Sequence, residues 1–525
     1  MPKPARDQWW DDVVSVDSVK LNNSTYLLWG DRVQVLERDE TKKQVKVFAR
    51  SSRGWIPESA LGGEPLLEVY FIDVGQGDGI LVVTPEGHHL VLDGGDRRGS
   101  QQTGKNAADF IDWKFHRDYL QKSEHGAVND EVRLDAMIVT HADTDHYGGL
   151  QDLIDRRREK DTDELQTRGV SVEAFYHPGL CPQTSGPEDL GSKTADGHYF
   201  NVLLEDRASA EDGVRDEPTG SLAIRGLYKK FIEAVLAQTT ADGTPTPITR
   251  LSQALEFLPG FEANGDSKVT IEVLAPIELK EHNGRPLLRD LGNEAVNKNG
   301  HSVALRLNYG KRRIVLTGDL NEKSHKLILD HYGEDFATRW GADVVKACHH
   351  GSHDIDFRFL QGIGALSTVF SSGDANTYDH PRAWVLGGAA LAGRVIVDGH
   401  RLKAPLVYST EVARSCSFKK IDQLRRYGDA QQWGPEQEKP VETVSGEKTM
   451  QKWRVVLDRK SKSSDAQQPV SAARVLHDVI YGLVNVRTDG KRLLFAVRNE
   501  GDHSWSFETI EEADIDAAIQ FGAPA

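Results

Sequence analysis

The sequence predicts an α/β fold spread over more than one domain. Its 525 residues exceed the length of an ordinary single domain and can form at least one large core. Hydrophobic residues make up 38% and charged residues 27% of the chain, a balance typical of soluble folded proteins. Short apolar segments with strand-like patterns recur along the chain, and residues 224–236 carry apolar side chains at helical spacing. Together these features predict sheets accompanied by helices.

The composition also indicates the cellular compartment and limits the kinds of binding partner. No run approaches the ~20 apolar residues of a membrane helix, and the first ten residues lack the apolar core of a signal peptide. Three widely spaced cysteines form neither a disulfide framework nor a zinc knuckle. We therefore expect a cytoplasmic protein that does not bind a membrane. The formal charge of −16 opposes extended, sequence-independent binding of nucleic acid unless cations are held locally.

Residues 1–16 are interpreted as a lead-in, and residues 17–64 predict a small β domain. Segments 31–37 and 43–49 alternate apolar and polar residues as half-buried strands do. Segment 54–61 begins Gly-Trp-Ile and resembles the signature of bacterial SH3-like barrels. Two interpretations follow. The barrel binds a protein partner with Trp55 in its groove, or Trp55 only fills the core of a barrel that braces its neighbour.

Residues 66–425 predict the main domain. Strands are expected at 67–74, 80–84, 89–92, 136–139, 268–274, 302–307, 313–316 and 342–347. Residues 180–290, rich in Gly, Pro, Asp and Thr, are interpreted as an insertion that contains the helix at 224–236. Residues 426–525 predict a linker with a strand at 453–457, and then a C-terminal α/β appendage with elements at 470–486 and 492–497.

The strongest chemical signal is the sequence THADTDHYGG at residues 140–149, directly after an apolar strand. It places two imidazoles and two carboxylates within six residues: His141, Asp143, Asp145 and His146. Divalent metals require several N and O donors close together, and the junction of a strand and a loop can direct such donors inward. A single His–Asp pair would more often be a capping or surface feature. Four such residues at this spacing predict a metal site, and the two glycines would permit a tight exit into a helix.

This segment resembles the metallo-β-lactamase signature in the form in which aspartate replaces the second histidine. Five further segments match in the same order: FIDVGQGD at 71–78, VLDGG at 91–95, IVLTGD at 314–319, VVKACHHGS at 344–352 and GDANTYDHP at 373–381. With them, residues 66–400 are similar to the hydrolase domain of ComEC-type competence proteins. The resemblance implies a four-layer αββα sandwich with a metal site at one edge of its sheets.

The resemblance also implies which residues hold two divalent ions, Zn²⁺ or Mn²⁺. His141 and Asp143 would bind the first ion and Asp145 and His146 the second, with Asp319 bridging them. Two adjacent histidines follow the strand at 342–347. Of these, His349 aligns with the last ligand position and His350 with a proton donor or substrate contact, although their order can be reversed.

The third histidine ligand of the family has two candidates. His301, in the sequence NKNGHS at 297–302, lies where metallo-β-lactamase relatives carry it, and a solvated loop histidine is the alternative interpretation. His177 is the competitor, for which we favour a structural role or a place at the pocket rim. Asp93 is predicted to orient a ligand histidine, whereas Asp73 and Asp78 are predicted to order the neighbouring Gly-Gln-Gly turn.

The predicted chemistry is hydrolysis by water activated between two metal ions. Asp145 would orient that water, and His350 or His380 would protonate the leaving group because imidazole titrates near neutrality. Bound ions also reverse the local field, so that an acidic protein accepts an anionic ester. Cations near the motifs, Lys346 among them, are usually solvated and are only minor candidates for contacting a phosphate.

Three functions stay open on the sequence alone. A phosphodiesterase or nuclease acting on a phosphoester, including nucleic acid, is the leading prediction. Hydrolysis of a small ester, lactone or phosphocholine is the second, although the wall-binding repeats of surface choline esterases in this family are absent. The third is an interaction or effector component of a larger bacterial assembly, such as an antiviral defence system, with a protein partner bound by the SH3-like domain.

Overall fold

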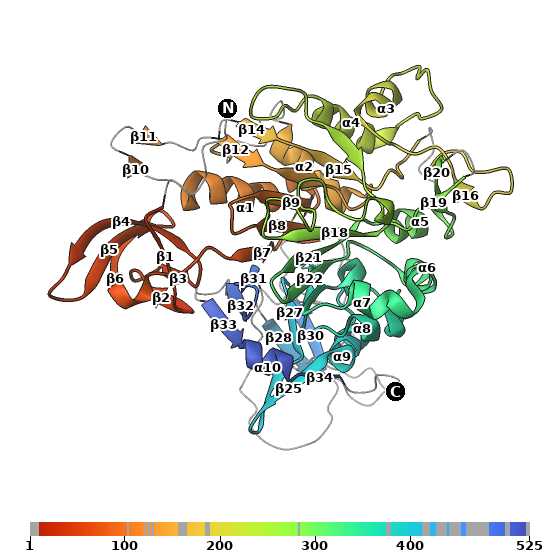
Figure 1. Cartoon of the computed structure of the whole chain (residues 1–525). Coiled ribbons are helices and arrows are strands. Elements are labelled where there is room, and N and C mark those ends of the chain that lie inside the picture. The colour runs from red at the N-terminus through yellow and green to blue at the C-terminus, as the bar shows by residue number, and fades with distance from the viewer. Residues whose placement is uncertain are drawn as a thin grey trace.

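Two large sheets lie face to face at the centre of the molecule (Figure 1). The computed structural model describes residues 10–101, 104–119, 131–155, 165–167, 169–183, 189–281, 284–373, 380–411, 482–498 and 505–520, and the backbone of five short strands outside these ranges. Among the described residues, no helix combines the length and the apolar character needed to cross a membrane.

The larger sheet has nine strands and the smaller has six. In spatial order the larger sheet contains β17 (Ile248–Arg250), β15 (Phe175–His177), β13 (Ala136–Ile138), β9 (His89–Gly94), β8 (Gly79–Val83), β7 (Leu67–Phe71), β31 (Val484–Thr488), β32 (Leu493–Arg498) and β33 (Trp505–Ile510). The smaller sheet contains β18 (Thr270–Ala275), β21 (Ala304–Tyr309), β22 (Arg312–Leu316), β23 (Val344–Lys346), β24 (Ser367–Phe370) and β27 (Leu406–Ser409). The eight strands predicted for the main domain are confirmed, with ends that differ by up to three residues.

The central strands are mostly apolar because both of their faces are covered. In β7, Val69 and Phe71 point into the core between the two sheets, whereas Tyr70 points to the opposite face. The neighbouring strand β8 alternates in the same way, with Ile80 and Val82 between the sheets. Since successive side chains of a strand lie on opposite faces, only a strand buried on both sides needs a continuous apolar run.

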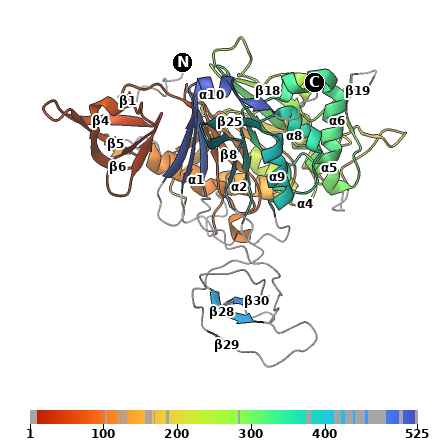
Figure 2. The ribbon, with the colours of Figure 1, turned by 90° about the horizontal axis from the view of Figure 1, so that it is seen from below.

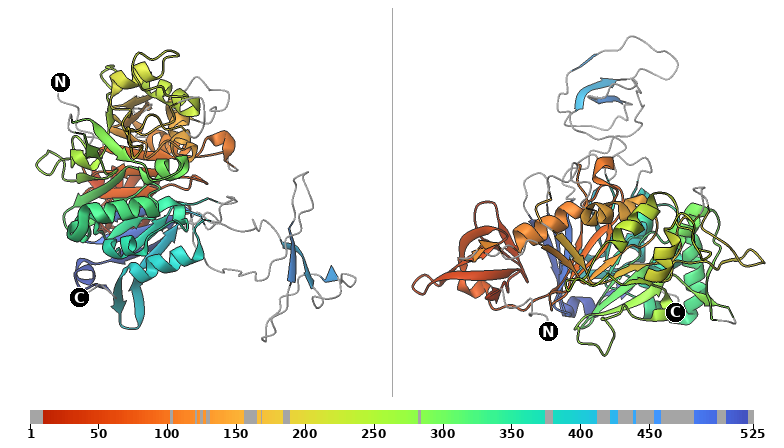
Figure 3. Two further views of the ribbon diagram at one scale, coloured as in Figure 1. Left: turned by 90° about the vertical axis from the view of Figure 1, so that its right-hand side faces the viewer. Right: turned by 90° about the horizontal axis from the view of Figure 1, so that it is seen from above.

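Helices cover the outer face of each sheet. The nine-stranded sheet packs against α1 (Ala107–Trp113), α2 (Thr144–Ile154) and α4 (Gly226–Leu236), and the six-stranded sheet packs against α6 (Glu322–Tyr332), α7 (Phe336–Trp340) and α8 (Phe357–Ile363). Figure 3 shows the two helical layers on opposite sides of the paired sheets. This is the four-layer αββα arrangement that the resemblance implied, so the predicted fold class is confirmed.

The segment predicted as an insertion also extends both sheets. It supplies α3 (Arg207–Gly213) and the predicted helix α4, and its strands β17 and β18 form one edge of each large sheet. Shorter pairings surround the core: β10 (Lys122–Ser123) with β11 (Gly126–Ala127), β12 (Glu131–Leu134) with β14 (Gly169–Val172), and β16 (Tyr199–Phe200) with β20 (Pro286–Arg289) and β19 (Leu279–Lys280). The remaining described helices include α5 (Glu294–Gly300), α9 (Ala383–Ala392) and α10 (Glu512–Asp516).

Residues 10–63, which we call the N-terminal β unit, lie beside the sandwich. The unit contains a four-stranded antiparallel sheet of β1 (Asp12–Val13), β4 (Arg32–Asp39), β5 (Gln44–Ala49) and β6 (Ser52–Pro57), and a ribbon of β2 (Ser18–Lys20) and β3 (Tyr26–Leu28). It has its own small core. The predicted strands are confirmed, but 37% of the surface of Trp55 is exposed. The alternative in which Trp55 fills the core is therefore wrong, and the SH3-like identity and partner binding stay predictions.

The C-terminal strands are part of the sandwich, which corrects the prediction of a separate α/β appendage. β31 pairs antiparallel with β7, and β32 and β33 continue the same sheet. The side chains of β31 and β32 are apolar enough on the inner face to join the core between the sheets. Strand β34 (Ile519–Gln520) pairs with β25 (Arg394–Asp398), next to β26 (Arg401–Ala404). The strand predicted at 453–457 is confirmed as β30 (Trp453–Leu457), which joins β28 (Ile421–Arg426) and β29 (Glu438–Lys439), whereas residues 470–481 lie outside the described residues.

Candidate metal centre

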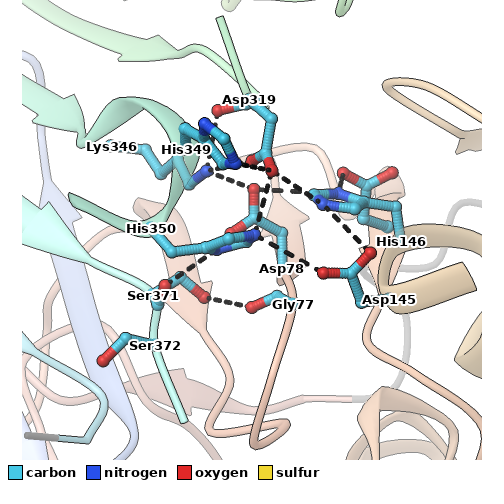
Figure 4. A network of polar contacts seen from close by, with 12 residues as sticks. Gly77, Asp78, Asp145, His146, Asp319, Lys346, His349, His350, Ser371 and Ser372 are labelled. Atoms are coloured by element: carbon cyan, nitrogen blue, oxygen red, sulfur yellow. Dashed lines mark hydrogen bonds and ion pairs between the residues drawn. The ribbon is translucent and has the colours of Figure 1, made fainter. Parts of the chain in front are cut away.

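Polar side chains from both sheets meet where four strands end. β9 runs parallel to β13, and β22 runs parallel to β23, so the carboxyl ends of each pair lie at the same edge. The motif at 140–149 follows β13 and enters α2, Asp319 follows β22, and His350 follows β23. The sandwich thus brings loops that are distant in sequence to one point (Figure 4).

The metal-binding residue types form one continuous cluster at this point. His146 Nε2 lies 3.3 Å and His350 Nε2 lies 3.0 Å from the same oxygen of Asp319. His350 Nε2 also lies 3.8 Å from Asp145 Oδ2, and the ring centroids of His141 and His146 are 4.0 Å apart. Four overlapping triads have their ligand atoms within 4.8 Å of one another: His141–His146–Asp319, Asp145–His146–His350, Asp78–Asp93–His146 and Asp78–Asp319–His350.

The central histidines are held so that a nitrogen lone pair faces the cluster. His146 Nδ1 lies 2.7 Å from Asp93 Oδ2, and His350 Nδ1 lies 3.0 Å from the carbonyl oxygen of Ser371. Carboxylate and carbonyl oxygens only accept hydrogen bonds, so each Nδ1 carries the proton in the neutral ring and each Nε2 keeps its lone pair. Both Nε2 atoms are buried and lack a hydrogen-bonding partner among the described residues. Such donors fit a divalent metal ion.

The electrostatic surroundings favour a cation. Burial alone would lower the pKa of His146, but Asp319, Asp93 and Asp145 raise it well above its ordinary value. Burial would likewise lower the pKa of His350, but its neighbours, chiefly Asp319, raise that pKa to about 10. The carboxylates therefore create a field strong enough to overcome the cost of burying a positive charge.

The structure reverses the order predicted for the two adjacent histidines. His350 is 1% exposed and lies in the cluster, whereas the side chain of His349 is 24% exposed and its Nε2 is 3.9 Å from Asp319. Asn299 Nδ2 lies 3.2 Å from the same nitrogen of His349. The structure therefore makes His350 the candidate ligand and His349 a residue at the margin. Both residues adopt the left-handed backbone region, with φ of 46° and 52°.

Two other predicted ligands do not join the triads. His301 Nε2 lies 2.8 Å from the carbonyl oxygen of Arg289, and burial lowers the pKa of His301 to about 4. The next residue, Ser302, contacts His141 Nδ1 instead, at 3.3 Å. Asp143 has one oxygen 3.5 Å from His141 Nε2 and forms an ion pair with Lys298 through the other. Asp143 therefore has a cationic partner, Lys298, even without a metal ion.

His177 and His380 lie apart from the triads in different ways. His177 is buried beside Phe175, with ring centroids 5.8 Å apart, and burial lowers its pKa to about 3, as expected for a structural residue. The ring of His380 lies 5.7 Å from that of His349 and 6.5 Å from that of His350. Burial, and then the charges of His350 and His349, lower the pKa of His380 to about 4. Near neutrality this imidazole is uncharged, and its role as the proton donor stays a prediction.

Sequence reasoning missed a buried ion pair inside the cluster. Lys346 is fully buried, donates to the carbonyl oxygen of Gly318 at 2.8 Å, forms an ion pair with Asp78, and lies 3.4 Å from Asp319 Oδ1. Asp78 in turn lies 3.2 Å from His350 Nδ1. Asp78 was predicted only to order its turn, and Lys346 to be solvated. The available signal was the position of Lys346 at the end of an apolar strand, where a buried charge needs a partner.

The paired glycines of the motif serve close packing rather than a turn. Gly148 and Gly149 both lie within α2, and a Cβ atom at Gly149 would be 1.9 Å from the carbonyl oxygen of Gly94. The helix therefore approaches β9 backbone to backbone. This contact places His146, on the first turn of α2, next to Asp93.

The chain is similar to competence proteins and matches no protein-family model. It is 33% identical to competence protein ComA of Neisseria gonorrhoeae over 95 residues, which is 18% of this chain and 13% of that protein. It is 24% identical to ComE operon protein 3 of Bacillus subtilis (strain 168) over 327 residues, which is 61% of this chain and 30% of that protein. The sequence resemblance deduced from the motifs is thereby confirmed, and the chain spans less than a third of either relative.

Two solved structures are also similar to the chain at low identity. A metallo-β-lactamase from Cronobacter sakazakii mutated in its HARLDQ motif matches with a TM-score of 0.22 and 11% identity, over 54% of this chain and 79% of that one. A diphosphatase of the PhnP family matches with a TM-score of 0.24 and 11% identity, over 58% of this chain and 85% of that one.

Proposed function

We propose that this protein is a metal-dependent hydrolase that holds two divalent ions, Zn²⁺ or Mn²⁺, and cleaves phosphodiester bonds, with nucleic acid as the leading substrate class. The observation that carries the proposal is the pair of buried Nε2 atoms of His146 and His350 around one oxygen of Asp319. His141 and Asp145 complete the donor set. Mixed imidazole and carboxylate donors suit both zinc and manganese.

The residues around the donor set fix its geometry. Lys346 lies near Oδ1 of Asp319 while the two histidines face Oδ2, so the carboxylate is held in one orientation. Gln76 donates from Nε2 to Asp145 Oδ2 at 3.2 Å and holds the second carboxylate. Divalent ions bound here would act as Lewis acids and would lower the pKa of a metal-bound water to near neutrality. His349 and His380, at the margin of the cluster, are placed to contact a substrate.

The charge balance supports an anionic substrate only when metal is present. The chain carries a formal charge of −16, and Lys346 is already neutralised by Asp78 and Asp319. Attraction of a phosphodiester would therefore depend on the ions themselves. This makes metal dependence of substrate binding, as well as of turnover, a requirement of the proposal.

A metal-loaded substrate panel tests the proposal. The full chain is stripped with a chelator and reloaded with Zn²⁺ or Mn²⁺. It is then assayed on bis-p-nitrophenyl phosphate, single- and double-stranded DNA, RNA and a lactone. We expect metal-dependent cleavage of the phosphodiesters, with Asp145→Ala reduced to background and Asp398→Ala, at an exposed position on β25, unchanged. Cleavage of the lactone alone would contradict the phosphodiesterase assignment, and full activity of Asp145→Ala would contradict the metal centre.

A further inference from the structure

A cavity lies between the N-terminal β unit and the sandwich, and it shares no residue with the metal centre. Its volume is about 410 Å³. Its walls come from the loop before β3, the turn between β5 and β6, the end of α1, and the ends of β31, β32 and β33. Figure 2 shows these parts side by side, with the N-terminal β unit next to α1 and the blue C-terminal strands. The volume is within the range of small-molecule sites.

Aromatic side chains form much of the wall. Tyr26, Phe110, Trp113 and Trp505 all line the cavity. The ring centroids of Phe110 and Trp113 are 5.9 Å apart, and Trp113 is 38% exposed although it is large and apolar. Trp113 therefore offers a flat surface on which a planar ring can stack, and Arg50 lies 5.5 Å from the ring centroid of Trp505.

The cavity also has more cationic than anionic side chains. Arg50, Lys114 and Arg498 line it, against one carboxylate, Asp118. Behind the wall, Arg487 pairs with Asp31 and Glu68, and Arg50 also pairs with Asp31. The whole group therefore holds four cations, Arg50, Lys114, Arg487 and Arg498, and three carboxylates, Asp31, Glu68 and Asp118, a surplus of one positive charge.

Arg498 accounts for this surplus. Within the described part of the chain it has no carboxylate partner, whereas Lys114 pairs with Asp118. Burial, and then repulsion by Arg50, lower the pKa of the Arg498 guanidinium. A charged group in surroundings that disfavour its charge gains most when an anion binds.

The backbone that presents Arg50 is strained. Arg50 and Ser51 form the two-residue turn between the paired residues Ala49 and Ser52, and their φ angles are 49° and 56°. Non-glycine residues with positive φ are uncommon and raise the energy of the backbone. The turn is held because Arg50 donates to the carbonyl oxygen of Tyr26 at 3.0 Å and pairs with Asp31. Its Nε lies 4.0 Å from Asp118 Oδ1, too far for a hydrogen bond, and has no hydrogen-bond acceptor among the described residues.

We propose that this cavity binds a nucleotide, with its base stacked on the aromatic wall and its phosphate on Arg498 and Arg50. The aromatic wall supplies the stacking surface, and guanidinium groups are the preferred partners of phosphate. The inference does not depend on the hydrolase proposal, because no residue of the metal centre takes part.

Calorimetric titration of the metal-free full chain tests this site. AMP, adenosine and inorganic phosphate are the three probes, and removal of metal prevents binding at the metal centre. We expect AMP to bind more tightly than either of its halves. Loss of one charge-assisted contact should weaken AMP binding about 10- to 100-fold in Arg498→Gln. Trp113→Leu should weaken it about fivefold or more through lost stacking.

The control is Arg401→Gln, which removes an exposed arginine from β26 that pairs only with Glu508 among the described residues. It should bind AMP as the wild type does. Absence of AMP binding, or equal binding by wild type and Arg498→Gln, would overturn the site. Phosphate that binds as tightly as AMP would overturn the nucleotide assignment, because the aromatic wall would then contribute nothing.

Discussion

Replacing Asp93 with asparagine isolates the contact that sets the proton on His146. Asp93 lies at a φ of 55°, a region that asparagine tolerates better than other non-glycine residues, so the backbone should not change. Its Oδ1 accepts from the backbone N–H of Thr140 at 2.8 Å, and its Oδ2 accepts from the Thr140 hydroxyl at 2.6 Å and from His146 Nδ1 at 2.7 Å.

The asparagine amide cannot satisfy all three donors. If its oxygen keeps the backbone N–H, its NH₂ group faces His146 Nδ1, which must then become an acceptor. The proton moves to Nε2 and removes the lone pair that faces Asp319 and Asp145. Loss of such an orienting partner typically weakens metal binding about 10- to 100-fold, or about 1.4–2.7 kcal/mol.

Asp112→Asn is a matched control. Asp112 Oδ1 also accepts from the backbone N–H and hydroxyl of one threonine, Thr167, at 2.9 and 2.6 Å, but Asp112 holds no histidine. Both variants should lose about 1–3 kcal/mol of metal-free stability through impaired buried hydrogen bonds. Only Asp93→Asn should lose metal affinity in a competition titration against a chromogenic chelator. Wild-type affinity in Asp93→Asn, or an equal loss in Asp112→Asn, would refute the orienting role.

Three further outcomes are expected. His350→Ala should weaken metal binding at least about tenfold, whereas His349→Ala should have a smaller effect, and the reverse order in the chelator titration would restore the sequence-based assignment. Burial lowers the pKa of His325 to about 3, so its protonation favours the unfolded chain and stability falls as the pH drops below about 6.5. When the pH falls from 7 to 5, the free energy of unfolding measured in urea should drop by about 2 kcal/mol less in His325→Gln than in the wild type. The same pH dependence in both proteins would contradict this. Gly149→Ala should lower the melting temperature sharply, because its Cβ would lie 1.9 Å from a carbonyl oxygen of β9. The control Gly387→Ala has open space around the added Cβ and should not lower it. Equal melting temperatures of the two variants would contradict the close packing.

The features that were predictable from the sequence are those encoded locally. The motif at 140–149 placed His141, Asp145 and His146 together because three chemically specific residues lie within six positions. Short apolar runs gave the strands of the main sheets. The side on which each of two adjacent histidines points could not be read in this way. Their orientation depends on left-handed backbone at both positions and on the distant acceptor Ser371.

Long-range pairing accounts for the other errors. Lys346 looked solvated because its partner Asp78 lies in another motif, and only the folded sandwich joins them. The C-terminal strands looked like an appendage because the sequence of β31 does not indicate which strand at a sheet edge it pairs with. β7, its neighbour, lies at the opposite end of the domain in sequence. Edge complementarity is a property of two segments together and cannot be deduced from either alone.

The ion pair between Arg487 and Asp31 has a consequence for synthesis of the protein. Arg487 is fully buried and contacts the N-terminal β unit through Asp31 and the carbonyl oxygen of Trp29. During translation, β7 and Asp31 leave the ribosome long before β31 does. Until then, one sheet edge has unpaired backbone groups, and such edges invite aggregation. We therefore expect ribosome stalling or premature termination upstream of β31 to yield an aggregation-prone, chaperone-dependent product rather than a smaller folded protein.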